Sequence, residues 1–177
     1  LRLPQAKSKL EDMGPNSSFK PIITTKHEGS GNGDVSVAIL CSGKISYDIQ
    51  ALLKENEALD KKTAIVRIEE LLPFPEPLLK DQLSQFTGLK KVYIENYSFQ
   101  IDFFLKKTGY LVQEEPYNAG GFAFAEPHIE RILTELNFDI NNFEAIARRS
   151  IATVATGAVN RHKEEVTALF STLKNKL

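Results

Sequence analysis

The stretch Val35-Ser36-Val37-Ala38-Ile39-Leu40-Cys41 is apolar at almost every position. A run of this kind is typical of a strand buried on both faces, as in a parallel sheet. Ser42-Gly43 follows it and predicts a turn. Apolar residues then recur at helical spacing, which places on one helical face Ile45, Ile49, Leu52, Leu53 and Leu59. This strand–turn–helix unit begins an alternating pattern.

The same alternation continues toward the C-terminus. Further strands are predicted at 63–68, near 89–93 and at 111–113, with one or two short strands within 146–156. Helices are predicted between and after them: one with Pro77 near its N-terminus, one that buries Ile129, Ile132, Leu133 and Leu136, and a last one capped by Asn160. The fold class predicted from this order is α/β, three-layered, with a mostly parallel sheet.

The first part of the chain has a different composition. Proline and glycine interrupt residues 1–34 at Pro4, Gly14, Pro15 and Pro21, so we expect an extended linker arm there, with one short helix near residues 7–12. Residues 35–177 are expected to form the α/β domain. The whole chain of 177 residues is of a size that favours one domain.

Composition and charge argue against several classes of partner. The 22 basic and 23 acidic residues give a net charge of −1. This balance offers no electrostatic reason for binding nucleic acid or an anionic membrane. No apolar run approaches the roughly 18 residues that span a bilayer. The single cysteine, Cys41, excludes an internal disulfide and a multi-cysteine metal cluster.

The run Gln113-Glu114-Glu115-Pro116-Tyr117-Asn118-Ala119-Gly120 places polar groups where a strand turns into a helix. Such positions often carry function in α/β folds. Adjacent residues on an extended segment point to opposite sides, so Glu114 and Glu115 are poorly placed for an acid–base dyad. Paired charges at an interface are the favoured interpretation.

Other polar residues also favour structural roles. Arg67 and Glu69 lie two apart on a predicted strand and therefore share a face, which suits an ion pair. Ser42-Gly43-Lys44 suits a plain turn, with anion binding at a helix N-terminus as the lesser alternative. The histidines at 27, 128 and 162 lack ligand spacing, so no metal site is predicted. No catalytic, cofactor-binding or metal-binding residue is assigned.

Several motifs, taken in order, carry a resemblance to a known family. They are Leu3–Ser8, Phe19–Ile23, Leu40–Lys44 with Tyr47-Asp48, Ile65–Pro75, Gln113–Gly120, and Arg149 with Ala155–Gly157 and His162–Glu165. This ordered set resembles the C-terminal domain of the thiamine diphosphate-dependent decarboxylase component of 2-oxoglutarate dehydrogenase. The 2-oxoadipate dehydrogenase-like relatives match about as well, so the parent substrate stays open between the two acids.

The resemblance implies a transketolase C-terminal-domain-like fold and a structural, dimerising role. It implies that thiamine diphosphate and Mg²⁺ are held by preceding domains of the same polypeptide, and that this chain alone is inactive. The full enzyme would decarboxylate 2-oxoglutarate in the tricarboxylic acid cycle. It would pass succinyl to a lipoyl succinyltransferase, with lipoamide dehydrogenase as further partner, in the mitochondrial matrix or the bacterial cytoplasm. The implied interface or structural residues are Arg67, Glu69, Gln113, Glu114, Glu115, Asn118 and Arg149.

The chain departs from the family pattern in two places. Residues 94–110 interrupt it, because Tyr93 would normally run almost directly into Leu111. We expect a lineage-specific insert or a wrongly translated segment there. The second departure is the segment 148–154, where the family has a glycine before its arginine and two prolines.

Two other functions remain as alternatives. A stand-alone regulatory α/β module could bind an anionic nucleotide or acyl-CoA through Ser42-Gly43-Lys44 and Arg149. A small hydrolase using Glu114 or Glu115 ranks below it, because the sequence shows no nucleophile or base partner.

Overall fold

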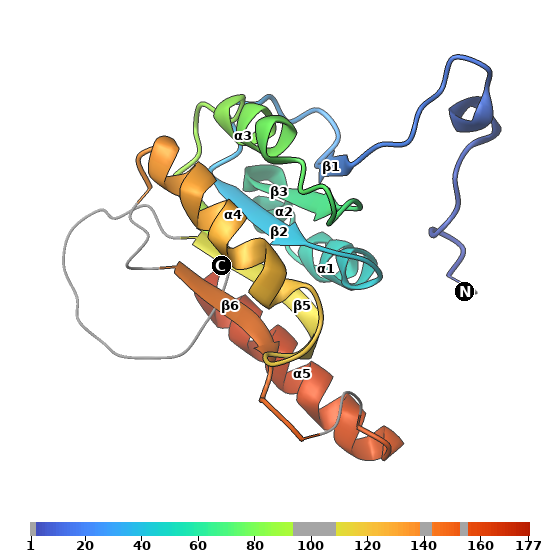
Figure 1. Ribbon diagram of the computed structural model, residues 1–177, viewed down its shortest axis with the longest axis vertical. Coiled ribbons are helices and arrows are strands. Elements are labelled where there is room, and N and C mark those ends of the chain that lie inside the picture. The colour runs from blue at the N-terminus through green and yellow to red at the C-terminus, as the bar shows by residue number, and fades with distance from the viewer. Residues whose placement is uncertain (1–2, 94–108, 139–142, 153–155) are drawn as a thin grey trace.

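The computed structural model describes residues 3–93, 109–138, 143–152 and 156–177. Its six-stranded sheet has the order β1-β3-β2-β5-β6, and β4 also pairs with β2. The strands are β1 (Ile22–Lys26), β2 (Val37–Cys41), β3 (Thr63–Ile68), β4 (Lys91–Tyr93), β5 (Gly109–Pro116) and β6 (Phe143–Arg148). Only the pairing of β1 with β3 is antiparallel among these. The predicted α/β class with a mostly parallel sheet is therefore confirmed (Figure 1).

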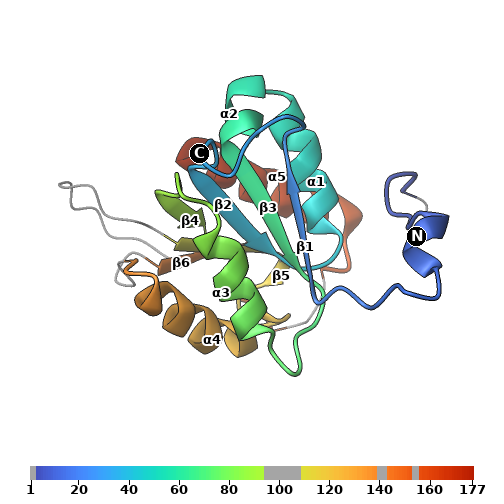
Figure 2. The same ribbon diagram turned by 90° about the horizontal axis from the view of Figure 1, so that it is seen from above.

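Helices cover both faces of this sheet. The α-helices are α1 (Ile45–Lys54), α2 (Glu57–Lys62), α3 (Glu76–Ser84), α4 (Phe122–Glu135) and α5 (Val159–Lys176), and a 3₁₀ turn, η1 (Leu10–Met13), lies away from the sheet. Residues of α3 and α4 pack on one face, and residues of α1 and α5 pack on the other (Figure 2). The three predicted layers are thus present.

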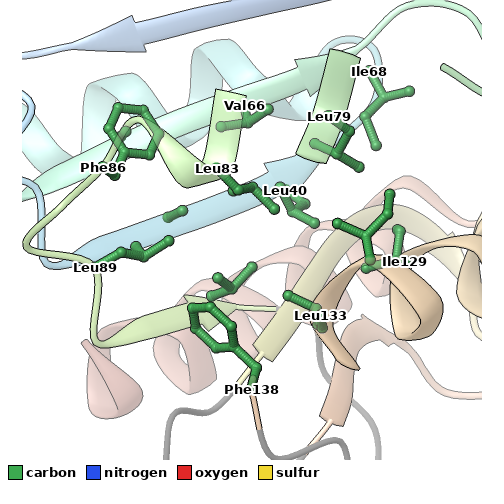
Figure 3. Close-up of a cluster of buried hydrophobic side chains, with 14 of the residues drawn as sticks. Leu40, Val66, Ile68, Leu79, Leu83, Phe86, Leu89, Ile129, Leu133 and Phe138 are labelled. Carbon is green, nitrogen blue, oxygen red and sulfur yellow. The ribbon is translucent and has the colours of Figure 1, made fainter. Parts of the chain in front are cut away.

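Strand β2 divides the core into two clusters. Ala38 and Leu40 belong to the cluster on the side of α3 and α4. Figure 3 shows Leu40 in this cluster with Leu79 and Ile129. The alternate residues Val37, Ile39 and Cys41 join the α1 and α5 side. Burial raises the pKa of the Cys41 thiol to about 12, so this thiol is unreactive near neutral pH.

Two helix boundaries differ from the sequence-based expectation. The apolar face that runs from Ile45 to Leu59 belongs to two helices, because Asn56 interrupts it and caps α2 by accepting a hydrogen bond from the backbone N–H of Leu59. The last helix begins earlier than predicted: its N-cap is Ala158, and Asn160 lies within the first turn.

The region expected as an extended arm contains one strand of the sheet. Ile22–Lys26 pair antiparallel with β3, from Ile22 opposite Ile68 to Lys26 opposite Ala64. The short helix predicted near residues 7–12 is η1. Residues 3–21 extend away from the sheet (Figure 1), and the name arm is used below for these residues alone.

The pairing of β2 bears on the suspected insert at 94–110. Ile39 lies opposite Tyr93 of β4, and the next residue, Leu40, lies opposite Leu111 of β5. Two consecutive residues of β2 therefore lie opposite Tyr93 and Leu111, which flank the suspected insert. This register is what an insertion into a single strand would produce. Residues 94–108 lie outside the described part of the chain, and the insertion remains a prediction.

Deletion of residues 94–110 should leave a folded protein, because Tyr93 and Leu111 would become consecutive without a change of register. We expect the free energy of unfolding to change by no more than about 1 kcal/mol, since loop length has a weak effect on closure entropy. Urea denaturation followed by circular dichroism measures it.

The matched control is deletion of residues 94–111, one residue longer. It moves Val112 by one position and turns its side chain to the opposite face of the sheet. If both deletions were equally destabilising, the single-strand interpretation would be wrong.

Candidate functional site at the carboxyl edge of the sheet

The carboxyl ends of the parallel strands bring most of the predicted site residues to one edge. β2 ends before Ser42, β3 ends at Ile68, β5 at Pro116 and β6 at Arg148. In open α/β sheets this edge is where ligands and functional loops gather. The contacts there show what each side chain does.

Gln113 organises the loop between β5 and α4. Its side-chain amide donates to the carbonyl oxygens of Pro116 (3.0 Å) and Ala119 (2.9 Å). Its Oε1 accepts from the backbone N–H of Phe122 at 3.2 Å, at the start of α4. Gln113 is only 5% exposed. A buried amide with all of these partners is a structural anchor rather than a reactive group.

Asn118 joins this loop to the segment after β6. Its Nδ2 donates to the carbonyl oxygen of Ile151 at 2.9 Å, and its Oδ1 accepts from the backbone N–H of Ile151 at 3.2 Å. The two bonds link the β5–α4 loop to a backbone position far along the chain.

Arg148 is the buried arginine of the site. Its side chain is 6% exposed. Nε donates to the backbone oxygen of Glu114 at 2.6 Å, and Nη1 donates to Thr156 Oγ1 at 2.9 Å and to Glu165 Oε2 at 2.8 Å. The hydrogen bond from Arg148 is the main reason why the pKa of Glu165 lies below its usual value. This residue ties β5, β6 and α5 together.

The arginine that anchors this segment within the chain is therefore Arg148, while the interface or structural role expected for its neighbour Arg149 stays a prediction. Arg149 is exposed. Side chains alternate along β6, and Ile146 is buried on the α5 side. Arg148 shares the parity of Ile146, so this alternation was the signal that could have identified it.

Glu114 and Glu115 have different surroundings. The Glu114 carboxylate lies 3.3 Å from Lys44 Nζ and 3.5 Å from His162 Nε2. Glu115 is exposed. Within the described part of the chain, no hydrogen bond or ion pair joins the two carboxylates. The arrangement gives no support to a carboxylate dyad.

Arg67 and Glu69 form an ion pair at the end of β3. Arg67 Nη1 also donates to Ser46 Oγ at 3.2 Å, and the guanidinium lies 5.1 Å from the ring centroid of Tyr47. Since Ser46 and Tyr47 belong to α1, these contacts fasten β3 to that helix.

A cavity of about 260 Å³ lies between these loops, with Ser42, Gly43, Lys44 and Glu114 in its wall. Lys44 is its lining cation, and it pairs with Asp48 at 2.6 Å as well as with Glu114. Partial burial lowers the pKa of Lys44, but these two carboxylates outweigh it and raise the pKa. Because two carboxylates already balance its positive charge, Lys44 is poorly suited to bind an anionic nucleotide or acyl-CoA.

The described residues offer no metal centre, because no three His, Cys, Asp or Glu side chains among them converge. His27 contacts Asp60 and His128 contacts Glu76. The donor set thus does not fit Mg²⁺ with thiamine diphosphate. None of the described helices is both long and apolar enough to cross a membrane.

Comparison with known proteins identifies relatives over nearly the whole chain. Residues 7–173 match the family model described as 2-oxoglutarate dehydrogenase C-terminal. The chain is 32% identical over 174 residues to the 2-oxoadipate dehydrogenase complex component E1 of Danio rerio. The aligned segment covers 97% of this chain and 16% of that protein. It is 27% identical over 165 residues to the 2-oxoglutarate dehydrogenase E1 component of Rickettsia felis, covering 93% and 14%.

The 2-oxoadipate dehydrogenase complex component E1 of Mus musculus is 37% identical to this chain over 136 residues, which cover 75% of this chain and 12% of that protein. The chain therefore spans only a small part of the length of the curated relatives it matches.

The substitution Gly120→Ala should destabilise the protein by about 1–2 kcal/mol. Gly120 has a φ of +76°, and an added Cβ would lie 2.9 Å from Gln113 Oε1. The control is Gly157→Ala, where an added Cβ meets no atom within 4 Å. Urea denaturation of both variants tests this, and equal losses would contradict the anchoring role of Gln113.

The pair Arg148→Met and Arg149→Met tests whether Arg148 is the arginine that anchors this segment. We expect Arg148→Met to lose about 2 kcal/mol, because it leaves buried acceptors without their donor. Arg149→Met should stay within about 0.5 kcal/mol of the parent.

The same pair has a pH dependence. Since the pKa of Glu165 is lowered in the folded state, the stability that its carboxylate contributes is present above the pKa of the unfolded state and is lost as pH falls through the pKa of the folded state. The difference measured by urea denaturation should therefore narrow in acid, and a larger loss for Arg149→Met would reverse the assignment.

Proposed function

Because the chain belongs to the 2-oxoglutarate dehydrogenase C-terminal family, we propose that it braces the structure of a thiamine diphosphate-dependent 2-oxo acid dehydrogenase component. Its role in that component is structural and dimerising. The residues that the structure describes supply no part of the active site in this proposal.

One observation supports this role above the others: polar side chains at the carboxyl edge, two of them buried, are bonded to the protein's own backbone. Gln113 bonds the turn that follows it, Asn118 bonds Ile151, and Arg148 bonds Glu114. A catalytic group needs a free acceptor or donor aimed at a substrate. These side chains instead stabilise loops, which produces a rigid edge suited to contact with other parts of an enzyme.

The full-length protein decarboxylates 2-oxoglutarate or 2-oxoadipate, since relatives with both names match the chain. Thiamine diphosphate supplies the carbanion-stabilising chemistry when bound. Residues outside this chain hold that cofactor and its Mg²⁺. The acyl product passes to a lipoyl-bearing acyltransferase, and lipoamide dehydrogenase completes the complex. Its compartment is the mitochondrial matrix in a eukaryote and the cytoplasm in a bacterium.

Isothermal titration calorimetry with thiamine diphosphate and Mg²⁺ tests the division of labour. The 177-residue chain should release no binding heat at millimolar cofactor, because its described residues contain no suitable donor set. The full-length protein from the same gene serves as positive control. Tight binding to the chain alone would show that the catalytic apparatus is not elsewhere.

A further inference from the structure

Another cavity, of about 560 Å³, lies at the amino edge of the sheet. β1, which continues from the arm, runs antiparallel to β3, so the end of β1 and the start of β3 meet at this edge. Residues of α1 and α2 complete the lining. Small-molecule sites have volumes of about 300–1,000 Å³, so this cavity is large enough for a small ligand.

The register of the sheet explains which side chains line this cavity. Thr63 and Ile65 are two residues apart on β3, and Thr25 of β1 lies opposite Ile65. These three side chains therefore share one face of the sheet, and Ile65 packs there in the cluster that contains residues of α1. The edge strand β1 thus forms one wall of the cavity, and α1 forms another.

The buried part of the lining is apolar except for one hydroxyl. Leu53 and Ile65 are each 2% exposed, and Thr63 is 1% exposed. Thr63 Oγ1 has no hydrogen-bond partner in the part of the chain that the structure describes. A buried hydroxyl nearly always has a partner, so this one marks a place where a ligand atom can supply the missing bond.

Some of the polar groups around the cavity are already paired. His27 Nδ1 lies 2.7 Å from Asp60 Oδ2, which ties the segment after β1 to α2. Lys26 Nζ donates to Asn32 Oδ1 at 2.9 Å. The hydrogen-bonding and charge requirements of these side chains are therefore met inside the chain.

Three other polar side chains of the lining have no such partner. They are Glu28 after β1, and Gln50 and Lys54 of α1. Across the described ranges, none of the three makes a side-chain hydrogen bond or an ion pair. One cavity thus presents an unpaired anion, an unpaired cation and an amide that can donate and accept. A ligand with a single charge would satisfy only one of the two charged groups.

We propose that this cavity binds an α-amino acid with a large apolar side chain. Its carboxylate pairs with Lys54 and accepts from Gln50, and its ammonium group pairs with Glu28, because charge-assisted hydrogen bonds are the strongest that these groups can make. Its side chain covers the apolar lining at Leu53 and Ile65. Such a site lies at the opposite edge from Gln113 and Arg148 and does not depend on the proposed function.

Isothermal titration calorimetry of the chain with L-phenylalanine tests the site. Two analogues serve as matched probes: 3-phenylpropanoate lacks the ammonium group, and 2-phenylethylamine lacks the carboxylate. We expect saturable binding of L-phenylalanine at millimolar concentration and an affinity at least about tenfold lower for each analogue, since each leaves one charged side chain without its partner. Absence of saturable heat with L-phenylalanine, or equal affinities for the three compounds, would overturn the proposal.

A pair of lysine variants places the binding in this cavity. Lys54→Met should weaken binding of L-phenylalanine at least about tenfold, because the carboxylate loses its cation. The same change should leave the affinity for 2-phenylethylamine unaltered. The control is Lys90→Met, which changes an exposed lysine at the same edge that does not line the cavity. Circular dichroism verifies that both variants are folded, and equal losses of affinity in the two would show that the amino acid binds elsewhere.

Discussion

Strand β2 is buried at each of its five residues, so both helical layers have to pack against it. Ala38 and Leu40 require α3 and α4 on one face, while Ile39 and Cys41 require α1 and α5 on the other. β2 also pairs with β3, β4 and β5. Because the strands beside it run parallel, their carboxyl ends meet at one edge, and the arrangement of the loops follows from this single buried strand.

Several polar residues at that edge bond the protein's own backbone. In a catalytic pocket, buried polar groups keep a hydrogen-bond donor or acceptor free for the substrate. Here Gln113 and Arg148 use their hydrogen-bonding capacity on neighbouring backbone oxygens. A family signature can therefore preserve the shape of a loop, because a buried amide or guanidinium without its partners is costly. The resemblance identified the family, and the contacts show which neighbours these residues bond in this chain.

Much of the fold could be predicted, because the apolar runs have the periods of buried strands and helices. β1 was missed because Ile22–Lys26 form a short edge strand whose last two residues are exposed, and such strands have little apolar signal. The sequence pattern predicts one helix across α1 and α2, because Asn56 separates the two helices without interrupting the helical spacing of the apolar residues. Gln113, Glu114 and Asn118 were located by motif, but their partners depend on tertiary contacts with Ile151 and Lys44. Those contacts cannot be derived from local pattern.

The continuity of β4 and β5 along β2 has a consequence for how the chain folds. Tyr93 and Leu111 lie opposite consecutive residues of β2. Two segments that follow one another along β2 are therefore distant in sequence. Closing a longer loop between these two residues changes the free energy of unfolding only slightly, since the closure entropy grows with the logarithm of loop length. Folding rate is more sensitive, because it falls as contacts join residues farther apart in sequence. A chain with this separation reaches the same sheet more slowly, and its unpaired strand edges are exposed to association for longer.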